Sequence, residues 1–142
     1  MCTATAVAYA LCMALGPNCA IVPDARVTSY VPQWGGINCM EPCDKTAFMS
    51  PVVYGETAAC GPSWPWNTHV AIFTPWGQVI ERRCQDRGGA ITDRHVDIAM
   101  TPEEHDRLPL YGYWPVLWFY PPEPPAPRET TISSRRHCHE ID

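Results

Sequence analysis

Prolines and glycines interrupt this chain so often that they exclude long helices from most of it. The 142 residues include 16 prolines and 9 glycines, and helical periodicity is scarce. Between the interruptions lie short runs of β-branched and aromatic residues, which are typical of strands. Hydrophobic residues make up 46% of the chain, enough for one buried core in one domain. The pattern therefore indicates an all-β barrel or sandwich.

Six segments are expected to be strands, and a short helix is expected before the last of them. The strands span residues 27–31, 51–59, 69–73, 78–84, 96–100 and 113–120. The helix spans residues 101–108, because Thr101 is an N-cap residue and Pro102 suits the first helical position. Glu103 and Glu104 then favour the positive end of its dipole.

Residues 1–25 form an apolar N-terminal segment, in which residues 1–23 carry no charge. Ala6 to Leu15 resembles the apolar core of a secretory signal, although a basic start and a clear cleavage site are missing. Two interpretations are open, the remnant of an export signal or a short apolar helix packed on the barrel. We favour the signal because the cysteine content suits an exported protein. About ten apolar residues are too few to cross a bilayer as a helix, so no stable membrane span is expected.

Eight cysteines in a small chain favour disulfides and an oxidising compartment, so we expect a secreted or cell-envelope protein. The alternative is a metal site. Cys39 and Cys43 are close in sequence, and Cys60, Cys84 and His95 could complete a ligand set. The core of the sequence has no second close pair of cysteines or histidines, so we prefer disulfides and expect neither metal nor cofactor.

The net charge of the chain and the composition of its C-terminal part limit which partners and which folded region can be expected. The net charge of −5 gives no basic field for nucleic acid, and a monomer is expected. From residue 121 the chain is rich in proline and then polar, so residues 121–142 are expected to form a disordered tail. One folded domain, residues 26–120, remains.

Two carboxylates, Asp86 and Asp97, are the main candidates for chemistry. Asp86 follows a strand-like run and precedes Gly88 and Gly89, which allow a turn. Asp97 alternates with Val96 and its apolar neighbours, so its side chain is expected on the face opposite Val96. Strand positions hold catalytic groups rigidly. A structural role, with Asp86 capping a turn and Asp97 solvated on a strand, is the alternative.

The segment around these aspartates resembles the three-aspartate (3D) domain. The matching residues are Asp86-Arg-Gly-Gly-Ala-Ile-Thr and His95-Val-Asp97-Ile-Ala-Met, supported by Thr28-Ser-Tyr30 and by residues 57–68. That domain is a double-psi β-barrel, as in lytic transglycosylase A and rare lipoprotein A-like proteins, and expansins and family 45 glycoside hydrolases share the barrel. The resemblance covers roughly residues 27–120 and implies a six-stranded double-psi β-barrel with one or two short helices.

The resemblance assigns roles and also shows two departures. It makes Asp97 the catalytic acid and Asp86 its support. The family's first aspartate corresponds here to Gly61, and Val31-Pro32 offers no counterpart of the catalytic base of family 45 enzymes. Within the predicted barrel we expect a disulfide between Cys60 and Cys84, and a second between Cys39 and Cys43.

Further residues are expected to bind a sugar chain. They are Thr28, Tyr30, Trp34, Trp66, Arg87, Gly88, Gly89 and His95, with Trp64 and Trp76 as further aromatic candidates. Each tryptophan is equally suited to fill the core, and Arg87 and His95 to form structural ion pairs.

By this resemblance the expected function is that of an exported lytic transglycosylase, which cleaves the bond between N-acetylmuramic acid and N-acetylglucosamine and leaves a 1,6-anhydro product. One carboxyl suffices for this reaction because the attack is intramolecular. The alternative is a non-catalytic, expansin-like module that binds or loosens wall polysaccharide. A family 45-type endoglucanase would need a second carboxylate facing Asp97, for which Asp44, Glu56 and Asp93 are candidates.

Overall fold

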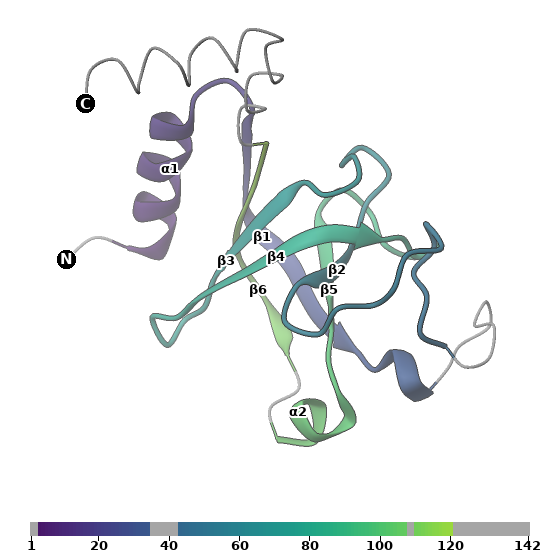
Figure 1. Cartoon of the computed structure of the whole chain (residues 1–142). Helices are drawn as coiled ribbons and strands as arrows, with labels where there is room; N and C mark the ends of the chain where they lie inside the picture. Colours follow the sequence, from purple (N-terminus) through teal and green to yellow (C-terminus); the bar gives the residue numbers. More distant parts are fainter. Residues whose placement is uncertain (1–2, 35–42, 108–109, 121–142) are drawn as a thin grey trace, which may run out of the picture.

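The structure is a computed structural model and describes residues 3–34, 43–107 and 110–120. The expected tail, residues 121–142, and the Cys39 half of the expected Cys39–Cys43 pair lie outside the described residues. The elements in chain order are α1 (Ala4–Leu15), β1 (Cys19–Tyr30), a 3-10 turn (Pro32–Trp34), β2 (Thr57–Cys60), β3 (His69–Phe73), β4 (Val79–Asp86), β5 (His95–Ala99), α2 (Pro102–Arg107) and β6 (Tyr111–Phe119) (Figure 1).

Six strands of the described chain close into a barrel in the order β1-β5-β2-β4-β3-β6. The pairs β1–β5 and β2–β4 are parallel, and the other four pairs are antiparallel. In each parallel pair the two strands are distant in sequence, because parallel strands can be joined only by a long connection. This closed all-β barrel with two short helices confirms the predicted fold class.

Alternation along the strands fills the barrel interior with apolar side chains. Val27, Ile72, Val96, Ile98 and Trp118 are all fully buried in one core cluster. The ring of Trp64, a candidate for sugar contact, stacks instead on Trp118 with ring centroids 5.0 Å apart. Trp64 is therefore a partly buried residue that packs against the core.

The first strand begins at Cys19, eight residues before the start expected at Val27. Its pairing with β6 shifts register between Val22 and Ala25. Pro23 lies in this irregularity, where its missing N–H costs no ladder hydrogen bond. The proline concealed the strand in the sequence, because it interrupts the alternation that continues on either side of it.

The helix α2 matches the expected helix closely. Thr101 Oγ1 accepts a hydrogen bond from the Glu104 N–H, and Glu104 Oε1 accepts one from the Thr101 N–H, each at 3.2 Å. This reciprocal pair is a capping box, which satisfies two free donors at the start of the helix.

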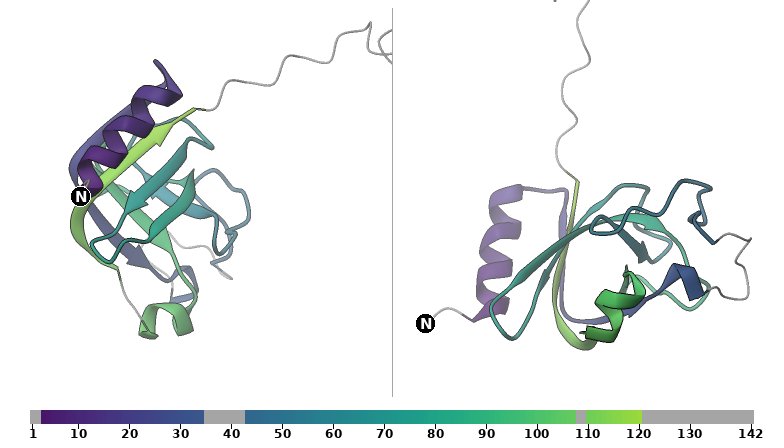
Figure 2. Two further views of the ribbon diagram at one scale, coloured as in Figure 1. Left: turned by 90° about the vertical axis from the view of Figure 1, so that its left-hand side faces the viewer. Right: turned by 60° about the horizontal axis from the view of Figure 1, so that its bottom comes forward.

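The helix α1 lies against the outside of the barrel, next to β1 and β6 (Figure 2). Ala8 is fully buried in a second apolar cluster with Ala71, Phe73 and Leu117. A disulfide from Cys12 to Cys19, which the sequence analysis did not pair, joins α1 to β1. Cleavage as an export signal stays a prediction. No helix in the described ranges is long and apolar enough to cross a membrane.

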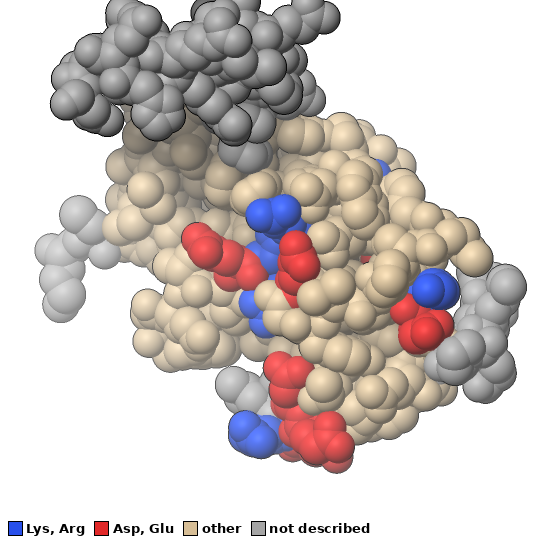
Figure 3. Space-filling view, viewed as in Figure 1, with Lys and Arg blue, Asp and Glu red and all other residues tan. Residues whose placement is uncertain are grey.

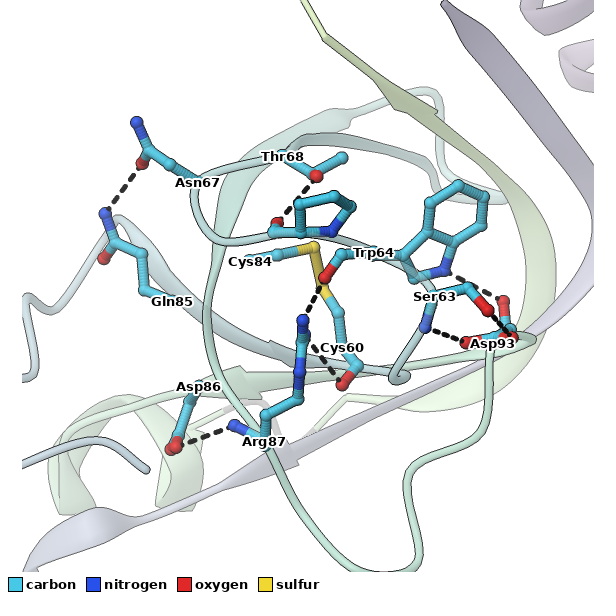
Figure 4. The surroundings of a disulfide bond; sticks show 11 residues. Cys60, Ser63, Trp64, Asn67, Thr68, Cys84, Gln85, Asp86, Arg87 and Asp93 are labelled. Atoms are coloured by element: carbon cyan, nitrogen blue, oxygen red, sulfur yellow. Dashed lines mark hydrogen bonds between the residues drawn. A yellow bond between two sulfur atoms is a disulfide. The ribbon is translucent and has the colours of Figure 1, made fainter. Parts of the chain in front are cut away.

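The predicted disulfide between Cys60 and Cys84 is confirmed. The two Cα atoms lie 5.4 Å apart, and both residues are fully buried. Cys60 ends β2, and Cys84 lies in the neighbouring strand β4, so the bond fastens this parallel pair close to Asp86 (Figure 4).

We predict that replacing both Cys60 and Cys84 by alanine lowers the free energy of unfolding by about 3 kcal/mol, because the bond closes a long loop in the unfolded chain. The matched control replaces Cys12 and Cys19 by alanine. Its sequence separation is 7 residues rather than 24, so the loss should be smaller. Urea unfolding followed by circular dichroism measures both, and an equal or larger loss in the control would contradict the prediction.

Candidate functional site

Strand pairing brings the two aspartates into one row across the barrel. In register, Thr28 of β1 lies beside Asp97 of β5, Asp97 beside Ala59 of β2, and Ala59 beside Asp86 of β4. Neighbouring strands are about 4.8 Å apart, so the Cα atoms of the aspartates lie about 10 Å apart across the small Ala59. The structure thus places both candidate catalytic residues in one local arrangement.

The row lies on the outer face of the barrel. Val96 and Ile98, which flank Asp97 in β5, are buried in the core, and Val27 beside Thr28 is buried there too. Because successive side chains of a strand alternate, Thr28 and Asp97 point outward. The expected orientation of Asp97, opposite Val96, is therefore correct.

Asp97 is a partly buried carboxyl with one strong hydrogen bond. Thr28 Oγ1 donates to its Oδ1 at 2.7 Å. Within the described ranges no hydrogen bond reaches its other oxygen, Oδ2. Burial is the main cause that raises the pKa of Asp97, and the negative charge of Asp86 adds to it. The Thr28 hydrogen bond and the charges of Arg26 and His105 act in the opposite direction without cancelling the rise.

Asp86 faces hydrogen-bond donors on both oxygens. Its Oδ1 accepts from the backbone N–H of Ala47 at 2.6 Å and of Arg87 at 2.8 Å. Its Oδ2 accepts from the hydroxyl of Tyr30 at 2.7 Å. Burial and the neighbouring carboxylates raise the pKa of Tyr30, so its hydroxyl keeps the proton that it donates. This arrangement suits an ionised carboxylate, which accepts hydrogen bonds and donates none.

His95 is connected to Asp97 through Thr28. Its Nε2 lies 2.7 Å from Thr28 Oγ1, the same hydroxyl that donates to Asp97. The His95 side chain is buried, and burial lowers its pKa, aided by the charge of Arg26. His95, a predicted sugar ligand, is therefore a buried and neutral side chain that positions the Thr28 hydroxyl by a hydrogen bond.

Arg87 and Trp66, both predicted ligands, lie in a second cluster beyond Asp86. The Arg87 guanidinium donates to the backbone carbonyls of Cys60, at 3.3 Å, and Trp64 (Figure 4). It also lies over the ring of Phe48, 5.1 Å from the centroid, and Phe48 meets the edge of Trp66. The Arg87 side chain thus holds the Cys60–Trp64 segment in place, while Trp66 stays 43% exposed.

Three other predicted ligands are less closely tied to the aspartates. Trp34 is 60% exposed and packs edge-on against His105 of α2. A Cβ at Gly88 would meet the Ile91 side chain at 2.8 Å, whereas one at Gly89 would meet nothing within 4 Å. Of the two glycines expected to allow the turn, only Gly88 therefore lies where a side chain would clash, and the clash would be with the flexible side chain of Ile91.

Gly61, which corresponds to the first aspartate of the three-aspartate domain in the sequence resemblance, packs closely against another part of the chain. A Cβ at Gly61 would lie 2.4 Å from both the backbone nitrogen and Oδ1 of Asp93 and 2.5 Å from the carbonyl carbon of Thr92, so there is no room for a side chain there. Asp93 accepts hydrogen bonds from both the N–H and the hydroxyl of Ser63, and these bonds lower its pKa. Sequence reasoning missed this close approach, because the two positions are distant in the chain.

The described residues contain no group of three or more His, Cys, Asp or Glu side chains placed to hold a metal ion. Of the ligands considered for zinc, Cys60 and Cys84 are joined in a disulfide. The Cys12–Cys19 and Cys60–Cys84 disulfides fit an oxidising compartment.

Comparisons with known proteins found no matching family model and no matching curated protein. Among solved structures, MltA from E. coli is similar to 53% of this chain, at 25% identity and a TM-score of 0.44. E. coli MltA with bound chitohexaose matches 60% of this chain, at 21% identity and a TM-score of 0.46. The matches span 26% and 28% of those MltA chains. These scores lie below 0.5, so the function proposed below rests on this chain's own residues.

We predict that Asp97→Asn stabilises the fold at pH 7. The pKa of Asp97 in the fold lies above its unfolded value, so the ionised form destabilises the fold at every pH above both values. Asparagine removes this cost, and Tm should rise by a few degrees at pH 7, with the gain disappearing as pH falls to about 4. The control Asp106→Asn changes an exposed carboxylate of α2 and should show no such gain. A lower Tm for Asp97→Asn at pH 7 would contradict the prediction.

Proposed function

We propose that this protein is an exported lytic transglycosylase that cleaves the bond between N-acetylmuramic acid and N-acetylglucosamine in peptidoglycan. The observation that carries the proposal is the pair of aspartates in one outer row, in which Asp97 has a raised pKa and one oxygen without a hydrogen-bond partner in the described ranges. The sequence resemblance of the same segment to the three-aspartate domain supports the assignment.

Asp97 acts as both acid and base in this proposal. Its protonated carboxyl gives a proton to the glycosidic oxygen as the bond to the anomeric carbon breaks. The resulting carboxylate then takes the proton of the 6-hydroxyl of the same muramic acid residue, whose oxygen bonds to the anomeric carbon. The products are a 1,6-anhydro sugar and a free 4-hydroxyl, and the carboxyl is restored. A raised pKa of Asp97 suits this cycle because the carboxyl must begin protonated.

Asp86 is a positioning residue in this proposal. Its charge raises the pKa of Asp97 across Ala59, and its three donors hold it in place. Two carboxylates in different surroundings thus take different roles.

Two of the three candidate partners for a two-carboxylate hydrolase, Glu56 and Asp93, are engaged elsewhere. The carboxylate whose charge raises the pKa of Asp97 is that of Asp86, which is held by three donors. Glu56 lies 3.7 Å from Arg83, and Asp93 is hydrogen-bonded to Ser63. We therefore prefer the mechanism with one carboxyl to a family 45-type endoglucanase.

A second candidate function is a non-catalytic, expansin-like wall-binding module. The replacement of the first family aspartate by Gly61 favours it. Such a module would bind sacculi or cellulose in a pull-down and release no soluble sugar product.

We predict that Asp97→Asn reduces the release of anhydro-muropeptides from purified sacculi at least about a hundredfold, because the amide cannot transfer the proton. Mass spectrometry of the soluble products measures this, with Asp106→Asn as the control expected to keep full activity. Full release by Asp97→Asn would refute the role of Asp97. Sacculus binding without any product from the wild type would favour the second candidate function.

We also predict that cleavage slows as pH rises through the raised pKa of Asp97, because the protonated fraction of the acid falls. Asp86→Asn removes a negative charge that raises this pKa, so the alkaline limb of the kcat/KM profile should move to lower pH. Profiles recorded from sacculus clearance at constant ionic strength test both statements. A limb that stays in place, or moves to higher pH, would contradict the charge coupling.

A further inference from the structure

Two exposed tyrosines lie at the start of β6, the strand that follows α2 (Figure 1). Tyr111 is 68% and Tyr113 61% exposed. Gly112 between them faces the interior, where the Trp114 ring lies so close that a Cβ at Gly112 would be 2.3 Å from it. The strand alternation therefore points both tyrosines outward, about 7 Å apart along the strand.

Tyr111 continues the row that holds the candidate catalytic residue, and Tyr113 lies in the neighbouring row, beside Arg26. Tyr111 pairs in register with Thr28, which pairs in turn with Asp97. Two strand spacings put Tyr111 about 10 Å from Asp97, measured between Cα atoms. That separation is comparable to the length of a disaccharide, so a glycan cleaved at Asp97 would reach the tyrosines within its next sugars.

Arg26 supplies a positive charge on the same surface. It is exposed, pairs in register with Tyr113 on one side and His95 on the other, and lies on the outer face of β1. In the described part of the chain no carboxylate lies within 4.0 Å of its guanidinium, since the ion pairs there are Arg83–Glu56 and Arg94–Asp24. Its charge nevertheless influences the pKa of both Asp97 and His95.

The chemistry of this surface fits a glycan that carries carboxylates. Exposed aromatic rings at the edge of a site are costly in water and gain contact by packing on the apolar face of a sugar ring. A guanidinium without a partner binds a carboxylate through paired hydrogen bonds. The net charge of −5 gives no general basic field that would draw in other polyanions, and the face shown in Figure 3 carries charges of both signs in small groups.

We propose that Tyr111, Tyr113 and Arg26 form a glycan-binding surface that extends from Asp97, in which the tyrosine rings pack on sugars and Arg26 binds a carboxylate of the glycan. This inference rests on the proposed function and assigns residues outside the pair of aspartates to the recognition of its substrate. Arg26 would favour binding of a muramic acid polymer, which bears a lactyl carboxylate on alternate sugars, over neutral polymers such as cellulose or chitin.

The test measures binding of two soluble glycans of equal length by isothermal titration calorimetry. One is a peptide-free oligomer of alternating N-acetylglucosamine and N-acetylmuramic acid, and the other is a neutral N-acetylglucosamine oligomer. All variants carry Asp97→Asn, so the glycan stays intact.

Tyr111→Ala and Tyr113→Ala should each raise Kd for both glycans about fivefold to tenfold, because contacts between the ring and the sugar are lost. Arg26→Gln should raise Kd severalfold for the muramic acid glycan alone and remove the salt dependence of its binding.

Matched controls are Tyr9→Ala on α1 and Arg107→Gln at the end of α2, both exposed and outside this surface. They should bind both glycans as the parent does.

The inference would be overturned, and the proposed activity left intact, if the tyrosine variants bound both glycans as tightly as the parent. A change of oligomeric state in these variants in place of a change in glycan affinity would have the same meaning. Tyrosine-dependent binding by a wild type that cleaves no sacculi would support the surface while overturning the activity. Absence of binding to either glycan would overturn both.

Discussion

The pairing of β2 between β5 and β4 is the constraint on which the candidate site depends. Ala59 pairs in register with Asp97 on one side and with Asp86 on the other. It is almost fully buried, and its small side chain leaves the two carboxylates close enough for their charges to interact. A shift of one residue in either pairing would turn an aspartate toward the core. The Cys60–Cys84 disulfide opposes such a shift, because it joins β2 to β4 beside this row.

The same row gives its two acids opposite surroundings. Asp86 accepts hydrogen bonds from three donors, two of which are backbone N–H groups. Asp97 accepts one hydrogen bond, from a hydroxyl, and burial is the main cause of its raised pKa. The donors come from three separate segments, since Tyr30 ends β1, Ala47 belongs to the connection before β2, and Arg87 follows β4. The difference between the two carboxyls therefore depends on contacts between segments that are distant in sequence, and the local motif alone does not produce it.

Local patterns predicted much of this protein. Alternation predicted the outward side chain of Asp97, the N-cap at Thr101 predicted α2, and the resemblance of residues 84–100 to a known barrel predicted the closed sheet and the Cys60–Cys84 bond. Features that depend on pairing between distant strands were missed. The start of β1 is hidden by Pro23, the Cys12–Cys19 bond requires α1 to pack beside β1, and the place of Tyr111 beside Thr28 follows only from the register of β1 with β6.

The approach of the Thr92–Asp93 segment to Gly61 has a consequence for how this protein could be engineered. The Cβ of any other residue at position 61 would lie 2.4 Å from both the backbone nitrogen and Oδ1 of Asp93, and 2.5 Å from the carbonyl carbon of Thr92. Shortening the Asp93 side chain would remove only one of these three overlaps, because the other two atoms belong to the backbone. An acid introduced at position 61 would therefore require the backbone turn before β5 to move.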